Sequence, residues 1–144
     1  MSLYTGFMTA ELQSLDHILE TFSFFDDWEG RYAYLVDLGK TVPEMDEALK
    51  TSENEVRGCT SKVWMAWDIR NGAFHFQADS NAMIVKGLIG VLMAIYQGKP
   101  VAEIPAIDVE KIFSQLGLEQ NLSPNRRSGF FSMVERIRAV SVQS

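Results

Sequence analysis

The chain has 144 residues, a formal net charge of −6 and a sequence pI near 4.9. Its length favours one domain, residues 1–144, with a single core, and its 47% hydrophobic and 22% charged residues are typical of a folded globular protein. The deficit of Lys and Arg argues against nucleic-acid binding, because that affinity comes from cations that displace counterions from phosphates.

The only cysteine, Cys59, rules out a disulfide within the chain and a four-thiolate metal or iron–sulfur site. The first residues lack a basic region followed by an apolar run, so we expect no secretion and a cytoplasmic location, where a thiol stays reduced. The most apolar stretch, residues 82–96, is shorter than the roughly 20 residues of a membrane-spanning helix. We therefore expect no membrane partner and interpret this stretch as a buried core helix.

Two amphipathic helices are expected before residue 40, because apolar residues recur there at helical spacing. The first stripe consists of Leu12, Leu15, Ile18, Leu19 and Phe22. The second consists of Trp28, Tyr32, Leu35 and Leu38. Asp26 is the expected N-cap of the second helix, with Glu29 completing a capping box, and Gly39 is its expected C-terminal stop.

The sequence pattern changes to a period of two residues over residues 63–70 and again over residues 74–79, so that alternate side chains share one face. Asn71 and Gly72 separate these runs, and both tolerate the positive φ angles of a two-residue turn. The pattern predicts an antiparallel β-hairpin. A short strand around residues 55–58 would add a third strand beside it.

Helices are expected again after the hairpin. Their boundaries are predicted at capping side chains and glycines: Asp79 or Ser80, Gly98, Asp108, Gly117 and Ser123. The order of helices, strands and helices predicts an α+β fold, in which a small antiparallel sheet of about three strands is flanked by helices.

Cys59 is the main candidate for chemistry, and it lies in the segment Val56-Arg-Gly-Cys-Thr-Ser-Lys-Val-Trp64. Arg57 and Lys62 place two cations near the thiol, and cations favour the nucleophilic thiolate. The hydroxyl of Ser61 can hydrogen-bond to it and support the loop. We predict a reactive cysteine with Arg57 tuning the thiolate, while a small buried hydrophobic cysteine stays open as the alternative.

Other thiol chemistries fit the sequence less well. A redox pair needs a second cysteine, and a phosphatase-type loop needs an arginine at the position of Met65. A cysteine–histidine hydrolase needs a neighbouring histidine as its base, and only His17 and His75 exist. We expect both histidines on solvent-facing sides of their elements, so a thiol hydrolase remains a weaker alternative.

Arg126 and Arg127 stand at the start of the last expected helix, where the helix dipole disfavours cations. This conflict indicates a partner for them elsewhere, such as a carboxylate or an anion. A solvated pair of arginines is the open alternative.

The Cys59 segment has the pattern Val-x-Gly-Cys-x-Ser-x-Val-Trp, which resembles the central motif of the SufE/CsdE family of sulfur-acceptor proteins. Three further blocks resemble the family in the same order along the chain: residues 28–45, residues 79–88 and residues 122–129. The resemblance covers about residues 12–138. Departures from the family pattern occur at Thr60, Lys62, Ala78 and Arg127, so the choice between the SufE and CsdE branches stays open.

The resemblance implies a fold similar to the IscU-type cluster scaffolds and a role as a sulfur carrier. Family members accept sulfur from a cysteine desulfurase that uses pyridoxal phosphate, stimulate it, and pass the sulfur to iron–sulfur cluster assembly. By position, Cys59 would be the acceptor and would hold a transient persulfide, with Arg126 supporting its loop. The expected partners are a SufS- or CsdA-like desulfurase and a downstream scaffold or other sulfur recipient.

In this interpretation the chain is not itself an enzyme and binds no cofactor or metal. Two alternatives differ in class. A cluster scaffold needs several converging ligands, and one cysteine is too few. An interaction protein would use the loop only for docking and leave Cys59 inert.

Overall fold

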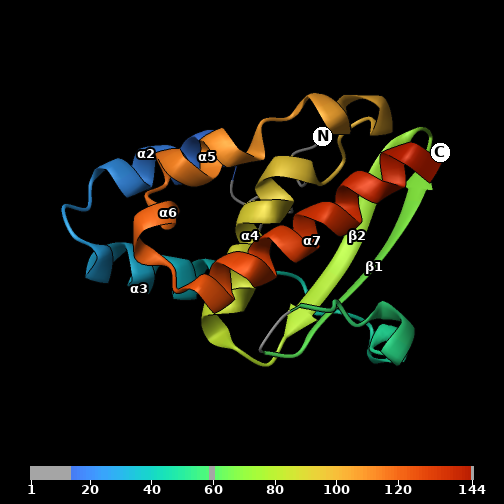
Figure 1. The fold of residues 1–144 in the computed structure, drawn as a ribbon, viewed down its shortest axis with the longest axis horizontal. Coiled ribbons are helices and arrows are strands. Elements are labelled where there is room, and N and C mark those ends of the chain that lie inside the picture. The colour runs from blue at the N-terminus through green and yellow to red at the C-terminus, as the bar shows by residue number, and fades with distance from the viewer. Residues whose placement is uncertain (1–13, 59–60, 144) are drawn as a thin grey trace, which may run out of the picture.

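The computed structural model describes residues 14–58 and 61–143. Its elements form an α+β arrangement in which helices pack against a two-stranded antiparallel sheet (Figure 1). In chain order they are α2 (Leu15–Ser23), α3 (Trp28–Gly39), the short 3-10 turns η1 (Glu47–Leu49) and η2 (Ser52–Asn54), β1 (Val63–Arg70), β2 (Ala73–Ser80), α4 (Met83–Tyr96), the 3-10 helix η3 (Val101–Ala106), α5 (Val109–Gln115), α6 (Leu118–Asn121) and α7 (Pro124–Gln143). The expected fold class is confirmed.

Helix α4 lies at the centre of the molecule, and eleven of its fourteen residues are buried. A helix that is apolar all round must be covered on every side. Helices α2, α3 and α7 and strand β2 all contact α4, and α7 runs across it in Figure 1. The expected buried core helix is therefore confirmed, and no helix of the described part of the chain is long and apolar enough to cross a membrane.

The hairpin has the expected two-residue turn. Asn71 and Gly72 adopt φ angles of 52° and 79°, and the pairing runs from Arg70 opposite Ala73 to Val63 opposite Ser80. These positive φ angles give the turn the same twist as the two strands that it joins. The hairpin prediction is confirmed in its turn and its first strand, while the second strand is one residue longer at each end than predicted.

The prediction of a third strand at residues 55–58 is wrong, because the sheet described here has two strands. Only an isolated bridge joins Glu55 to Trp64, and the Val56 N–H donates to the Val63 carbonyl at 2.8 Å. The segment cannot extend this pairing, since η2 ends immediately before it and Gly58 turns away with a φ of 87°. The residues before Cys59 thus join the hairpin at its open end without forming a strand.

Two helix N-caps lie one or two positions after the residues that the sequence predicted. Asp27, rather than Asp26, caps α3, because its extended backbone lets its Oδ1 accept the Gly30 N–H at 3.0 Å. The residue at the N-cap of α4 is Ala82, and it makes no side-chain cap. Ser80 instead stays in β2, where its Oγ accepts the Ala82 N–H at 3.1 Å and donates to a backbone carbonyl. The predicted caps or stops at Gly98, Asp108, Gly117 and Ser123 are confirmed.

Helix α3 ends at Gly39 as predicted, although without a left-handed turn, because the following cap residue, Lys40, is right-handed helical. The role of Gly39 is a close contact between helices. A Cβ on Gly39 would lie 2.8 Å from the backbone nitrogen of Gly87, and a Cβ on Gly87 would overlap the carbonyl oxygen of Leu35. Helices α3 and α4 can approach this closely only because both positions are glycine.

We expect Gly87→Ala to lower the free energy of unfolding by about 3 kcal/mol, because the added methyl meets rigid backbone of α3. Urea unfolding measures this change. Gly90→Ala is the matched control, since it lies in the same helix and its Cβ would meet only side-chain atoms, the nearest of them in Leu38. The control should lose only about 1 kcal/mol, because the Leu38 side chain, 2.9 Å from this Cβ, can shift where the backbone of α3 cannot. Equal losses in the two variants would contradict the close contact.

Candidate functional site

One face of α7 lies against the segment that contains the cysteine motif. Arg126, Gly129, Met133 and Arg136 recur every three or four positions, so they share this face of the helix. Arg126 and Arg136 make hydrogen bonds to residues on the two sides of Cys59. Cys59 and Thr60 themselves lie outside the described residues, so the site is defined by its neighbours.

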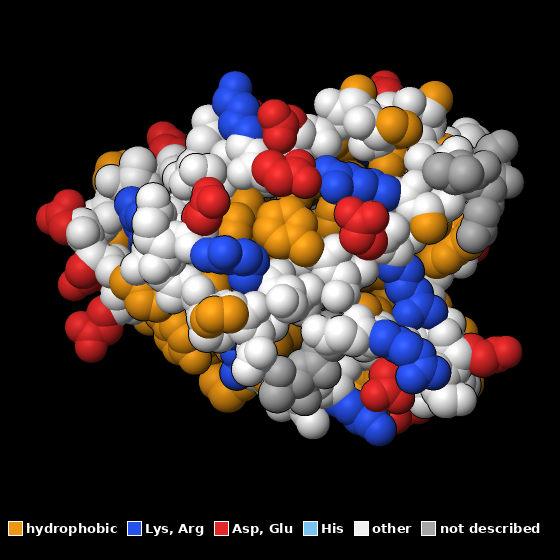
Figure 2. Space-filling view, in the orientation of Figure 1, with side chains coloured by type: hydrophobic (Ala, Val, Ile, Leu, Met, Phe, Trp, Pro, Cys, Tyr) orange, Lys and Arg blue, Asp and Glu red, His pale blue; other side chains and the backbone are white. Residues whose placement is uncertain are grey.

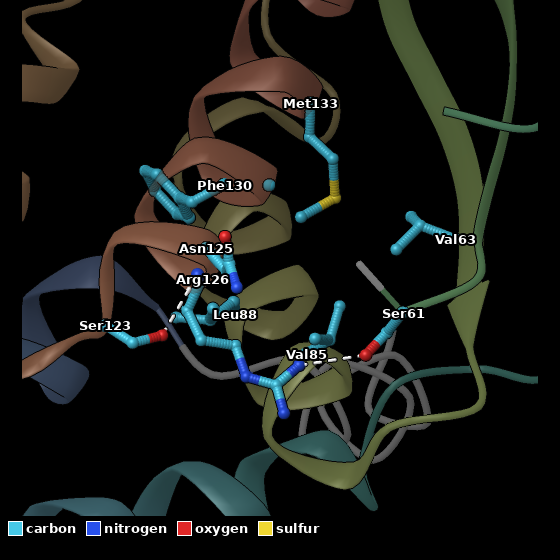
Figure 3. A pocket seen from close by; sticks show the side chains of 10 residues that line it. Ser61, Val63, Val85, Leu88, Ser123, Asn125, Arg126, Phe130 and Met133 are labelled. Atoms are coloured by element: carbon cyan, nitrogen blue, oxygen red, sulfur yellow. Dashed lines mark hydrogen bonds between the residues drawn. The ribbon is translucent and has the colours of Figure 1, made fainter. Parts of the chain in front are cut away.

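Arg126 joins α7 to the motif. Its Nη1 donates to the Oγ of Ser61 at 2.9 Å, across 65 positions of sequence, and both residues are partly buried. The backbone N–H of Arg126 donates to the Oγ of Ser123, which caps the start of α7 (Figure 3). The guanidinium therefore stands at a fixed place beside the residue two positions after Cys59.

Arg126 is half-buried and Arg127 is exposed, and among the described residues neither forms an ion pair with a carboxylate that lies within 4 Å. Arg127 donates from its Nη2 to the backbone carbonyl of Glu119 at 2.6 Å. Arg126 and Arg127 thus both use neutral oxygen acceptors. The expectation of a partner is confirmed, with neutral oxygens in place of a carboxylate, and approach to an anion remains a prediction.

A pocket of about 190 Å³ opens between the motif and helices α4 and α7 (Figure 3). Its apolar walls are Val63, Val85, Leu88, Phe130 and Met133. Its polar residues are Ser61, Ser123, Asn125 and Arg126. An apolar cavity with one guanidinium beside it suits a soft, polarisable anion, such as a thiolate or an ionised persulfide.

The other two cations of the motif have different surroundings. Arg57 is exposed, and Lys62 is 54% exposed, with its Nζ 3.8 Å from Glu55. An exposed cation acts on a nearby thiol through water, so its effect is weaker than that of a partly buried one. The tuning of the thiolate by Arg57 remains a prediction.

Asp79 anchors the base of the hairpin behind the motif. Its carboxylate accepts Lys50 at 2.8 Å and Lys86 at 3.4 Å, and the Nζ of Lys50 also lies over the ring of Trp64. Burial alone would raise the pKa of the Asp79 carboxyl, but the bonds from Lys50 and the Ser80 N–H and the charge of Lys86 together hold this pKa below its usual value. The ionised carboxylate ties the segment with η1 to β2 and α4.

The sequence analysis missed Arg136 and Ser132. Arg136 donates from Nη1 to the Glu55 carbonyl at 2.9 Å and from Nη2 to the Glu53 carbonyl at 2.7 Å. A Cβ on Gly58 would lie 2.7 Å from the Oγ of Ser132, so α7 also approaches the backbone directly before Cys59. The helical spacing of Arg126 and Arg136 was the available signal, since it places both on one face.

The two histidines lie in α2 and β2. His17 is exposed on α2, and His75 lies five residues along β2 from Ser80, on the order of 17 Å from the end of the hairpin that the motif joins. Among the described residues, no group of three His, Cys, Asp or Glu side chains could hold a metal ion.

The family model SufE, described as an Fe-S metabolism associated domain, matches residues 16–141. The chain therefore belongs to the SufE family, as its motif blocks indicated.

Individual relatives agree with this assignment. An uncharacterised SufE-like protein of Rhizobium etli is 48% identical over 131 residues, which cover 88% of each chain. The sulfur acceptor protein CsdE of Escherichia coli is 37% identical over 124 residues, or 85% of this chain and 84% of that protein. The solution structure of a hypothetical protein from Thermus thermophilus matches with a TM-score of 0.72 over 90% of this chain and 93% of that one. At 21% identity, this last likeness shows the fold alone.

A double-mutant cycle tests the Ser61–Arg126 contact. We expect Ser61→Ala and Arg126→Ala to be coupled by about 1 kcal/mol in unfolding free energy, because each removes the same partly buried hydrogen bond. The control pairs Ser61→Ala with Arg127→Ala, which removes the same charge from the same end of α7. That pair should be additive within about 0.5 kcal/mol. Additivity in the Arg126 cycle would show that the contact does not form in solution.

Proposed function

We propose that this protein accepts sulfur from a cysteine desulfurase on Cys59, carries it as a persulfide, and delivers it to iron–sulfur cluster assembly while stimulating the desulfurase. The observation that carries this proposal is the hydrogen bond between Arg126 and Ser61 beside an apolar pocket, two positions after the cysteine. Membership of the SufE family supports it, as does the relative from Escherichia coli that is named a sulfur acceptor protein.

The chemistry is an exchange at sulfur. The thiolate of Cys59 attacks the terminal sulfur of a persulfide on the desulfurase, one S–S bond forms, and the S–S bond of the donor breaks. The donor cysteine leaves as a thiolate, so one neutral sulfur atom moves and no external oxidant or reductant is needed. Delivery repeats the same exchange with Cys59 as the leaving group.

The surroundings of the motif match the needs of this exchange. The cations Arg126 and Arg57 favour the thiolate form before the attack and the anionic persulfide after it. The pocket beside Ser61 offers apolar surface that would shield the bound sulfur from water and from small thiols. Arg126 supports the loop through Ser61, and Arg57 is a tuning group at the surface.

Charge distribution favours one end of the molecule for docking. In Figure 2 acidic side chains are spread over the end of α2 and α3, while Lys and Arg side chains gather around the base of the hairpin. Arg57, Lys62 and Arg126 belong to the motif end, although the whole chain carries a net charge of −6. An acidic surface beside the desulfurase active site would therefore steer the motif end toward it.

Intact-mass measurement tests the proposal. The protein is mixed with a cysteine desulfurase and L-cysteine without reductant, and we expect it to gain the mass of one sulfur atom. The gain should disappear on addition of a thiol and be absent in Cys59→Ser. Arg127→Ala is the control on the same end of α7 and should still gain sulfur, because its side chain binds α6 rather than the motif.

Other outcomes separate the alternatives. If Cys59 can be alkylated but gains no sulfur from any cognate desulfurase, the carrier function is wrong. A Cys59→Ser variant that stimulates the desulfurase as well as the wild type would assign the loop to docking. Turnover of esters or peptides without a partner protein would point to a thiol hydrolase.

A further inference from the structure

We propose that Arg136 is a positioning residue for sulfur transfer. It fixes the segment before Cys59, as Arg126 fixes the segment after it. This inference rests on the proposed function and concerns the same site. Arg136 contacts no reacting atom of this site. It acts through the backbone that leads to the cysteine.

Arg136 holds two nearby carbonyls of the backbone with one planar group. Its two terminal nitrogens donate to the carbonyls of Glu53 and Glu55, at 2.7 and 2.9 Å. Only arginine offers this rigid fork of donors, and its charge strengthens both hydrogen bonds. The side chain bonds to backbone atoms, so the identities of residues 53 and 55 matter less than the path of the chain.

The contacts of α7 follow the chain in order. Arg136 meets Glu55, Ser132 approaches Gly58, and Arg126 meets Ser61, so the segment runs antiparallel to the helix. The two arginines are ten positions apart, which is about 15 Å along α7. Both sides of the Cys59 segment are therefore tied to a single rigid element.

Two further hydrogen bonds hold the residues on both sides of Cys59 to the hairpin. The N–H of Val56 donates to the carbonyl of Val63, and the Oγ of Ser80 donates to the carbonyl of Lys62. Val63 also forms a wall of the pocket. Arg136 thus sets where this segment starts relative to the pocket, and loss of that setting would misplace the thiol at the moment of attack. Small misplacements of reacting groups are costly in rate, while they leave the docking surface intact.

Arg138 provides a matched control on the same helix. It also makes charged contacts, with Glu110 at 3.0 Å and Glu135 at 3.4 Å, but these tie α7 to α5 and to its own preceding turn. Replacing Arg138 by alanine removes a partly buried arginine without touching the Cys59 segment. General weakening of α7 would affect both variants alike.

The test uses the full chain and a desulfurase preloaded with persulfide, in single turnovers followed by rapid quenching. We expect Arg136→Ala to lower the maximal transfer rate about tenfold. The desulfurase concentration that gives half of this rate should stay unchanged, and Arg138→Ala should leave both quantities at wild-type values. Arg136→Lys should recover only part of the rate, because an ammonium lacks the planar fork.

Two comparisons exclude other roles of Arg136. Arg136→Lys keeps the charge, so an electrostatic role of Arg136 predicts full recovery of the transfer rate in this variant, whereas positioning predicts only partial recovery. Amide hydrogen exchange at residues 55–58 should become faster in Arg136→Ala and stay unchanged in Arg138→Ala.

A wild-type transfer rate in Arg136→Ala, or equal losses in the two alanine variants, would overturn the inference. Full recovery of the rate in Arg136→Lys would assign Arg136 an electrostatic role instead and overturn the inference as well. Failure of the wild-type chain to accept any sulfur would overturn the proposed function, and hydrogen exchange would still show whether Arg136 holds the segment.

Discussion

Burial of α4 on every side is the constraint from which the site follows. A helix with apolar residues around its whole circumference needs several covering elements, and here α3, β2 and α7 each supply one side. Covering α4 with both α7 and the hairpin brings α7 beside the end where the motif joins β1. The pocket lies at that meeting point, with walls from α4, α7 and β1.

Hydrogen bonds from α7 then fix the position of the motif beside this apolar pocket. The face of α7 that turns toward the hairpin combines apolar residues, which line the pocket, with arginines that reach backbone and hydroxyl oxygens. Hydrogen bonds from a charged donor to neutral acceptors leave the arginine with its positive charge uncancelled. A thiolate or persulfide nearby would therefore experience a cation that also serves as a structural tie. In the proposed function, Arg126 would both support the loop and stabilise the sulfur anion.

Local signals made the hairpin and several helix boundaries predictable. Asn71 and Gly72 specify their turn by backbone preference alone, and Asp108 and Gly117 act within one helical turn of their own positions. Asp26 was wrongly predicted as the N-cap of α3, because the next residue is also an aspartate and either side chain can cap a helix. Gly39 was correctly predicted as the end of α3, but its close contact with Gly87 could not be predicted, since Gly87 lies 48 positions later in a different helix.

Long-range contacts set the limit for the site. The motif itself could be recognised in the sequence, and with it the family. No local pattern shows, however, that Arg126 reaches Ser61 or that Arg136 reaches Glu53 and Glu55, because these partners are 65 to 83 positions apart. The third strand expected at residues 55–58 does not form, and the backbone there is held by Arg136 and by one isolated bridge.

Transfer onward is the most direct test of the claim that the protein carries sulfur. Cys59 would be loaded from a desulfurase with heavy-sulfur-labelled cysteine, the desulfurase removed, and a cluster-assembly scaffold with free cysteines added. The account predicts that the labelled sulfur leaves Cys59 and appears on the scaffold without any added thiol, as sulfur exchange requires. Label that stays on Cys59 in the presence of every candidate recipient, and leaves only when a small thiol is added, would contradict the account.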